Sequence, residues 1–329
     1  MLIVMACFTA PLSAITLEEV KERGELNCGV STGLPGFSNP DGEGQWSGLN
    51  VDICRAVAAA ALGDAGRVKF IPLTEKTQMT ALQSGEVDLL SKNIGWNMTG
   101  DTALGLHFTG IAFYDGQSLL VRKKLNVTSA LELTGAAVCL QEGSAYGIRL
   151  QEYLNEHKIV YKVLPTENSA QDLKEIAAGR CDVVTGRRSS LYGLLQKTEK
   201  PEDVMILPEV ISREPVGPVV RQGDDGWFNL VRWTLFAMIN AEAYGINSAT
   251  IEAAKLSSEP GIRRLLGLDG IKGKGLGVAD DWAYQVIRQV GNYGEIFERN
   301  IGINSPLNMD RGLNGLWNRG GILYAPPMN

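Results

Sequence analysis

Two stretches of the chain decide the fold: GLPGFSNPDGEGQWSGLNVDICRAVAAAALG at residues 33–63 and TALQSGEVDLL at residues 80–90. In the first, residues 49–61 have the apolar spacing of an amphipathic helix, and Asp52 in its first turn favours the helix dipole. A short strand is expected next, at residues 68–73. This part of the chain therefore alternates between helix and strand.

The second stretch continues the alternation. Residues 77–84 are predicted to be helical, with Gly85 as a C-terminal cap, and residues 87–90 form the next strand. The same order of elements recurs between residues 136 and 185. Such βαβ units predict a mainly parallel sheet covered on both faces, so their repetition predicts two α/β lobes that open and close about a hinge. Two short runs are predicted to cross between the lobes: residues 118–121 and 217–220.

These stretches resemble the periplasmic solute-binding proteins of polar-amino-acid ABC importers. The resemblance is greatest to the general L-amino-acid branch, through YDGQ at 114–117, AGRCDV at 178–183, GNYGEIFERNIG at 291–302 and LWNRGGILYAPP at 316–327. It extends from about residue 16 to the C-terminus. It implies an α/β fold of the type II periplasmic-binding class, in which two Rossmann-like lobes are joined by two crossing strands and a C-terminal extension lies on lobe 1.

The resemblance and the pattern of elements together divide the chain. The sequence after residue 224 is predicted to be helical with an apolar stripe, and the Gly-rich remainder is expected to wrap around the first lobe. The expected divisions are a signal peptide at 1–14, lobe 1 at 15–115, a hinge at 116–126, lobe 2 at 127–214, a second hinge at 215–222, and the rest of lobe 1 with the extension at 223–329.

The N-terminus has features of a secretory signal. Residues 1–14, MLIVMACFTAPLSA, are apolar and end in small residues, but no Lys or Arg precedes them, as in a truncated signal. A lipoprotein box at residues 4–7 and a buried N-terminal strand are the alternatives. No other stretch reaches the about 18 apolar residues that span a bilayer. We therefore expect a soluble, periplasmic monomer, and the net charge of −6 argues against nucleic acid as a partner.

Four cysteines remain after Cys7, and an even number behind a signal peptide favours disulfides. Cys28 and Cys54 belong to the first lobe, whereas Cys139 and Cys181 belong to the second. A bond between the lobes would stop them moving, so one bond within each lobe is expected. Four buried thiols are the alternative. The sequence has no CxxC motif and no Cys/His cluster, so we expect no metal site and no cofactor.

The residues that should bind the ligand depart from the pattern of the resembled family. A buried amino-acid zwitterion needs a cation for its carboxylate and an anion for its ammonium group. The family supplies an Arg and an Asp for these roles, but here Gly100 stands at the place of the Arg and Arg187 at that of the Asp. Gly95 and Asn97 stand at usual Ser or Thr positions, and Ala145 stands at the place of a lobe 2 Thr.

These departures change the expected ligand. Arg187 and Arg188 side by side favour an anionic group, and Ser144 at a helix start adds backbone N–H donors. Loss of the Arg at Gly100 would enlarge the pocket on lobe 1. We therefore predict a larger anionic ligand: a γ-glutamyl compound such as glutathione, a dicarboxylate or an acidic peptide. The alternatives are that both Arg side chains point to solvent, that the protein binds L-amino acids in general, or that it binds none.

Other candidates lie at the carboxyl ends of predicted strands, where open α/β sheets bind ligands, or at the hinge. Trp96 could stack on a ligand or belong to the core. The ligand-binding residues that we expect are Glu75, Lys92, Asn93, Trp96, Asn97, Gln117, Ser144, Ala145, Tyr146, Arg187 and Arg188.

The leading functional interpretation is a binding module that captures a small polar solute, closes around it and docks on the membrane permease of an ABC importer. A sensor that reports its ligand to a receptor would share the same sequence features. The rival class is an enzyme of the cyclohexadienyl dehydratase type, in which Glu75 could act as a general acid only if burial raised its pKa. Paired carboxylates and Ser/His or Cys/His patterns are absent from the sequence, so we expect no enzymatic activity.

Overall fold

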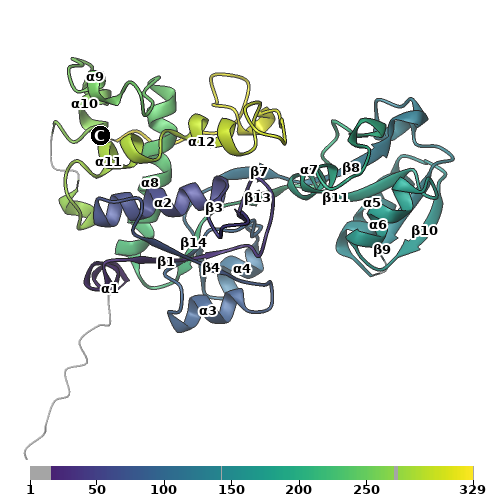
Figure 1. Cartoon of the computed structure of the whole chain (residues 1–329), viewed down its shortest axis with the longest axis horizontal. Coiled ribbons are helices and arrows are strands. Elements are labelled where there is room, and N and C mark those ends of the chain that lie inside the picture. Colours follow the sequence, from purple (N-terminus) through teal and green to yellow (C-terminus); the bar gives the residue numbers. More distant parts are fainter. Residues whose placement is uncertain (1–15, 142, 270–272, 329) are drawn as a thin grey trace, which may run out of the picture.

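The computed structural model describes residues 16–141, 143–269 and 273–328. Within these ranges the chain forms two α/β lobes connected by a narrow waist (Figure 1). The expected signal peptide at residues 1–14 lies outside the described residues. In the described part of the chain, no helix combines the length and the apolar character needed to cross a membrane.

Lobe 1 is built on a mixed five-stranded sheet. The first three strands are parallel, as the βαβ pattern predicts, but β14 pairs antiparallel with both of its neighbours. In spatial order the strands are β4 (Val68–Pro72), β1 (Leu26–Val30), β5 (Leu89–Leu90), β14 (Val219–Arg221) and β6 (Leu106–Phe108).

Helices cover both faces of this sheet (Figure 1). On one face α2 (Leu49–Leu62) packs against α8 (Asp225–Ala243) and α11 (Trp282–Gln289). Helix α2 ends where Gly63 adopts φ 74°, and the N–H of Gly63 donates to the carbonyl of Ala59. The remaining helices of this lobe are α1 (Thr16–Arg23), α3 (Gln78–Ser84), α4 (Met98–Ala103), α9 (Ile251–Ala254), α10 (Pro260–Leu265) and α12 (Tyr293–Asn300).

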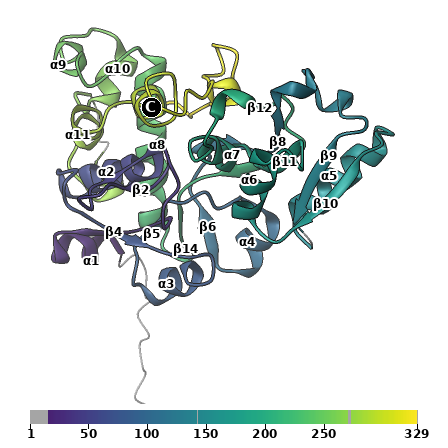
Figure 2. The same ribbon diagram turned by 45° about the vertical axis from the view of Figure 1, so that its right-hand side comes forward.

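Lobe 2 repeats the arrangement with a second five-stranded sheet. Its strands are β10 (Lys162–Thr166), β9 (Ala137–Gln141), β11 (Val183–Arg187), β8 (Gln117–Arg122) and β12 (Val204–Ile206). The first three are parallel and β8 is antiparallel to both neighbours. Its helices are α5 (Ala145–Glu156), α6 (Ser169–Ala177) and α7 (Arg188–Leu195). Figures 1 and 2 place α7 on the side of lobe 2 nearest to lobe 1.

The crossing between the lobes lies a few residues before each predicted run. An antiparallel ladder of β7 (Phe113–Asp115) and β13 (Glu214–Val216) connects the lobes. Residues 118–121 instead pair within the second sheet, and residue 219 pairs within the first. The physical reason is that the apolar run Leu119–Val121 is fully buried, as expected of a sheet-centre strand covered on both faces.

The chain after α12 packs on lobe 1 and also contacts the crossing ladder. Leu316 and Leu323 are buried in the lobe 1 core. Asn314 holds the backbone of Tyr114 in β7, since its Oδ1 accepts from the Tyr114 N–H at 2.6 Å and its Nδ2 donates to the Tyr114 carbonyl at 3.3 Å. The expected extension therefore contacts the crossing ladder as well as the core of lobe 1.

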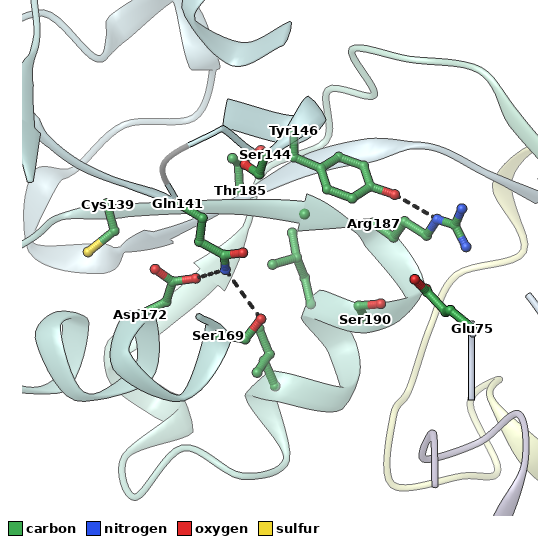
Figure 3. A pocket seen from close by; sticks show the side chains of 13 residues that line it. Glu75, Cys139, Gln141, Ser144, Tyr146, Ser169, Asp172, Thr185, Arg187 and Ser190 are labelled. Carbon is green, nitrogen blue, oxygen red and sulfur yellow. Dashed lines mark hydrogen bonds between the residues drawn. The ribbon is translucent and has the colours of Figure 1, made fainter. Parts of the chain in front are cut away.

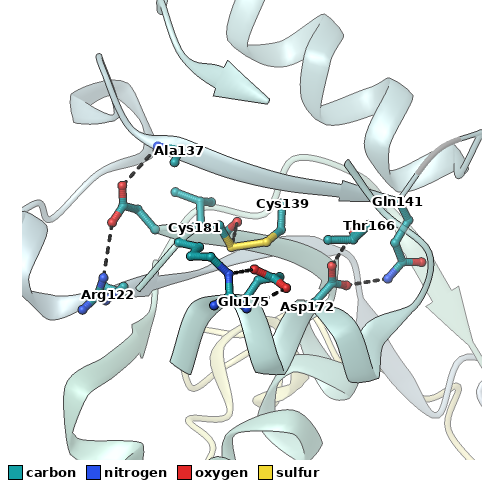
Figure 4. The surroundings of a disulfide bond; sticks show 11 residues. Arg122, Ala137, Cys139, Gln141, Thr166, Asp172, Glu175 and Cys181 are labelled. Atoms are coloured by element: carbon teal, nitrogen blue, oxygen red, sulfur yellow. Dashed lines mark hydrogen bonds and ion pairs between the residues drawn. A yellow bond between two sulfur atoms is a disulfide. The ribbon is translucent and has the colours of Figure 1, made fainter. Parts of the chain in front are cut away.

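Each lobe contains the expected disulfide. Cys28–Cys54 joins β1 to α2, with its Cα atoms 6.2 Å apart. Cys139–Cys181 joins β9 to a residue two positions before the start of β11, with its Cα atoms 5.8 Å apart (Figure 4). The pairing predicted from the assignment of cysteines to lobes is confirmed.

We predict that replacing both cysteines of either pair by Ala lowers the free energy of unfolding by about 2–5 kcal/mol, because the unfolded chain regains the freedom of a closed loop. Urea unfolding of Cys28→Ala/Cys54→Ala and of Cys139→Ala/Cys181→Ala would measure the loss, with reduced wild-type protein as the control. Non-reducing peptide mapping that found four free thiols in the exported protein would contradict the assignment.

Candidate functional site

The cleft between the lobes contains two adjoining cavities of about 240 and 370 Å³, here named the lobe 2 cavity and the lobe 1 cavity. Glu75, Arg187 and Ser190 line both. The other residues of the lobe 2 cavity are Cys139, Gln141, Ser144, Tyr146, Ser169, Asp172, Thr185, Gly186, Leu191 and Leu194. Those of the lobe 1 cavity are Ser31, Thr32, Leu34, Leu73, Thr74, Gln78, Lys92, Asn93, Ile94, Gly95 and Asn97.

Several polar residues of the cleft lie at the carboxyl ends of parallel strands or in the loops that follow them. Glu75 follows β4, Lys92 and Asn93 follow β5, Gln141 ends β9 and Arg187 ends β11. Parallel strands of one sheet end at the same edge, so residues distant in sequence converge there. The two sheets present these edges to one cleft.

Arg187 stands at the boundary between the two cavities, and its charge is already paired. Its Nε donates to Glu214 Oε2 at 2.7 Å. The same Nε also donates to the Tyr146 hydroxyl at 2.7 Å, the contact drawn in Figure 3. Its Nη1 donates to the backbone carbonyl of Asn93. Arg187 therefore connects lobe 2, the crossing strand β13 and lobe 1.

Glu214 is the centre of this network. Its Oε2 accepts from the Tyr146 hydroxyl at 3.0 Å, and its Oε1 accepts from Ser212 Oγ at 2.9 Å and from Arg149 Nη1 at 3.2 Å. Burial alone would raise the pKa of Glu214, but the Arg187 charge and these hydrogen bonds outweigh burial and hold the pKa below 4.5. Burial, aided by Glu214 and opposed by Arg187, raises the pKa of Tyr146 to about 12. Tyr146 is therefore a neutral donor at physiological pH.

Lys92 places a second cation in the cleft, on the lobe 1 side. The side chain is 7% exposed, and its Nζ donates to the Leu73 carbonyl at 2.6 Å. Burial lowers the pKa of the Lys92 ammonium group below 10.5, and the charge of the Glu75 carboxylate opposes this shift. A buried ammonium group favours a bound anion, so Lys92 can receive a carboxylate.

Asn93 makes a second contact between the lobes. Its Nδ2 donates to Ser189 Oγ at 3.3 Å, and its Oδ1 accepts from Asn50 Nδ2 at 2.8 Å. Ser189 Oγ donates in turn to Asp115 Oδ2 at 2.5 Å, and burial raises the pKa of the Asp115 carboxyl. The start of α7 is thus fixed to the crossing strand β7 and to the end of β5.

Gln117 and Ser144 support the cleft from lobe 2. Gln117 is fully buried and lines neither cavity; its Nε2 donates to the Tyr146 carbonyl at 2.7 Å and to Thr185 Oγ1 at 2.8 Å. Ser144 caps α5, where its Oγ accepts from the Gly147 N–H at 3.0 Å, and it faces the lobe 2 cavity. Gln117 therefore positions Tyr146 rather than contacting the cavity space.

Three further expected residues, besides Gln117, line neither cavity. Arg188 donates to the Pro208 carbonyl at 3.5 Å and stacks on the Tyr192 ring, 5.9 Å from its centroid. Arg187 ends β11 and Arg188 starts α7, so their side chains diverge and form no paired cationic site. Trp96 stacks on Phe108 at 5.4 Å in the lobe 1 core, and Ala145 is exposed at the start of α5.

The glycines of the lobe 1 loop have different surroundings from those expected. A Cβ on Gly100 would lie 3.3 Å from a ring carbon of Phe108, so this position faces the packed core and its glycine does not enlarge the cleft. Asn97 lines the lobe 1 cavity and caps α4 through the Gly100 N–H. A Cβ on Gly95 would lie 3.6 Å from Arg187 Nη2, so a longer side chain there would meet the guanidinium. The glycine at position 95 therefore leaves room for the guanidinium of Arg187, so the two departures from the family pattern are sterically compatible.

Sequence reasoning missed several polar residues of the site. Gln141 directly follows a predicted strand, so its position at a strand end could have identified it. Asp172 lies inside a helix and Glu214 in a short crossing strand, and neither carries a sequence signal of its own. In the described part of the chain, no group of three or more His, Cys, Asp or Glu side chains is placed to hold a metal ion.

The family follows from a sequence comparison. The family model of bacterial extracellular solute-binding proteins, family 3, matches residues 26–248. The chain belongs to this family. The resemblance and the type II periplasmic-binding fold expected from the sequence are thereby confirmed.

Relatives that align over almost the whole chain are periplasmic or amino-acid-binding proteins. A general L-amino acid-binding periplasmic protein of Rhizobium johnstonii is 51% identical over 99% of this chain and 96% of its own length. A glutamate/glutamine/aspartate/asparagine-binding protein of Rhodobacter capsulatus is 46% identical over 96% of this chain and 94% of its own. A periplasmic binding protein from Brucella ovis, solved with glutathione bound, is 48% identical with a TM-score of 0.86, covering 95% of this chain and 99% of the other.

We predict that Glu214→Gln lowers the free energy of unfolding by about 2–4 kcal/mol near neutral pH, because half-buried Arg187 loses its counter-charge. The pKa of Glu214 is lowered in the folded state, so its contribution to stability is present above the ordinary value of 4.5 and is lost as the pH falls below it. Urea unfolding near neutral pH and at pH ~3 should show the difference between wild type and variant shrinking in acid.

Glu152→Gln on the exposed surface of α5 is the matched control and should change neither value. A Glu214→Gln variant as stable as the control at neutral pH would mean that the pair contributes nothing to the fold.

Proposed function

We propose that this protein is the substrate-binding component of an ABC importer and that it binds an amino-acid-derived solute larger than a single amino acid. The favoured ligand is a γ-glutamyl compound such as glutathione, which carries two carboxylates and one ammonium group. In this proposal the ligand occupies both cavities, the lobes close on it, and the closed form docks on a membrane permease.

The observation that carries the proposal is the position of Arg187 between the two cavities. The cation reaches from β11 across to the Asn93 carbonyl, in the place where the resembled family holds an Asp for an amino-acid ammonium group. A ligand bound at this place contacts the Arg187 cation instead, although Glu214 neutralises part of the Arg187 charge. A single amino acid would therefore lack the partner for its ammonium group. A longer ligand can extend beyond Arg187 and contact residues of both cavities.

The carboxylates of such a ligand have two candidate partners. Nη2 of Arg187 makes no hydrogen bond among the described residues, and Lys92 lies in the lobe 1 cavity with its charge opposed only by exposed Glu75. Two cations on either side of one cleft suit a ligand with two separated carboxylates. The Brucella ovis protein, at 48% identity, holds glutathione, which is a compound of this kind.

A general L-amino-acid binder is the second candidate, favoured by 51% identity to the Rhizobium johnstonii protein of that name. The two candidates differ in what they require of Arg187. A γ-glutamyl compound needs the cation for a carboxylate, whereas a set of unrelated single amino acids would be held by other groups of the cleft.

We predict that glutathione raises the melting temperature of the purified protein strongly, while L-alanine and L-leucine do so weakly. A ligand that binds only the folded state stabilises it by an amount that grows with the logarithm of the ratio of ligand concentration to Kd. Arg187→Ala should weaken glutathione binding in calorimetry by about 2–5 kcal/mol. Arg188→Ala removes a neighbouring guanidinium that lines neither cavity and is the matched control. Equal stabilisation by many L-amino acids, with Arg187→Ala neutral, would favour the general binder.

A further inference from the structure

The end of the lobe 2 cavity remote from Lys92 contains a buried carboxylate with no cation. Asp172 is 2% exposed, lies in the first turns of α6 and lines this cavity. Its Oδ1 accepts from Thr166 Oγ1 at 2.7 Å, and its Oδ2 accepts from Gln141 Nε2 at 2.5 Å (Figure 4). Among the described residues, no Lys, Arg or His forms an ion pair with it. Its negative charge is therefore balanced only by neutral donors and by the helix dipole.

Asp172 determines which way the Gln141 amide faces. An ionised carboxylate can only accept hydrogen bonds, so the NH₂ group of Gln141 must turn toward it. That NH₂ group also donates to Ser169 Oγ at 3.4 Å, which occupies its second hydrogen. Oε1 of Gln141 consequently points the other way, and Figure 3 shows it on the side of the amide away from Asp172, among the residues that line the cavity. No donor among the described residues reaches this oxygen.

We propose that Gln141 is a ligand-binding residue whose Oε1 accepts a hydrogen bond from a nitrogen of the ligand, and that Asp172 is the positioning residue that fixes this orientation. The inference rests on the proposed function and assigns the ligand group bound at this end. The group is an ammonium in preference to a neutral N–H, because the buried charge of Asp172 stands directly behind the amide.

This assignment supplies the partner that the substitution at position 187 removes. Arg187 and Gln141 line the same cavity, one presenting a cation and the other an acceptor backed by a carboxylate. An extended zwitterion can then lie with a carboxylate toward Arg187 and its ammonium group toward Gln141. A purely structural role for Asp172 would need only the helix dipole and Thr166, which together stabilise its buried carboxylate. Such a role would not require the Oε1 acceptor of Gln141 to face the cavity.

The test compares two ligands that differ only in the ammonium group. Glutathione and its deamino analogue, in which glutaryl replaces γ-glutamyl, are titrated by calorimetry into wild type, Gln141→Leu and Asp172→Asn. Wild type should prefer glutathione by roughly 10- to 100-fold, the range for a hydrogen bond to a charged group. Gln141→Leu should bring the ratio close to 1. Asp172→Asn should reduce it, because an Asn amide can donate to Gln141 and no longer enforces one orientation.

Gln151→Leu on α5 is the matched control, since Gln151 lines neither cavity of the cleft, and it should keep the wild-type ratio. A merely structural Asp172 would weaken both ligands equally and leave the ratio unchanged. An unchanged ratio in Gln141→Leu would overturn the inference while leaving the proposed function intact.

A second pair of probes, L-glutamate and glutarate, separates the two proposals. If glutathione fails to bind but L-glutamate binds with a preference over glutarate that Gln141→Leu abolishes, the ligand size is wrong and the assignment of Gln141 stands. If wild type binds neither glutathione nor L-glutamate, both proposals are overturned.

Discussion

The ion pair between Arg187 and Glu214 is the interaction on which the cleft depends. Partly burying a guanidinium in a cleft raises the free energy of the folded state unless a fixed carboxylate faces it. Glu214 provides that carboxylate from the crossing strand β13, at 2.7 Å, and is itself held by Ser212 and Arg149. The Arg187 charge in the candidate site is therefore fixed to the crossing strand β13, and a change in the geometry of this strand would change the position of the guanidinium.

This arrangement explains why so many polar contacts lie at the waist of the molecule. Arg187 reaches the Asn93 carbonyl on lobe 1, and Ser189, two residues later, connects Asn93 to Asp115 in β7. Asn314 holds β7 from the other side through the Tyr114 backbone. The candidate site, the crossing ladder and the C-terminal extension are thus joined through short chains of hydrogen bonds, so a movement of the lobes about this ladder would rearrange contacts of the candidate site.

Sequence alone could predict the lobes, the strand ends and the disulfides, because these follow from local periodicity and from which cysteines share a lobe. It placed Lys92 and Asn93 on the cleft because both follow a predicted strand. It could not predict the partner of Arg187, since Glu214 lies 27 positions away in a strand of three residues. It also paired Arg188 with Arg187, because adjacency in sequence does not reveal that a strand ends at one residue and a helix starts at the next.

The Cys139–Cys181 bond bears on the proposed ligand contacts of lobe 2 as well as on stability. Cys139 lies two residues before Gln141 on β9, and Cys181 lies six residues before Arg187 at the end of β11. The bond therefore ties together the two strands whose ends carry the acceptor and the cation of the lobe 2 cavity. In the proposed binding mode, a fixed spacing between Gln141 and Arg187 sets the distance between the two ligand groups that contact them, so a ligand of another length would lose one contact. The disulfide would then constrain ligand length through the spacing of these two strand ends.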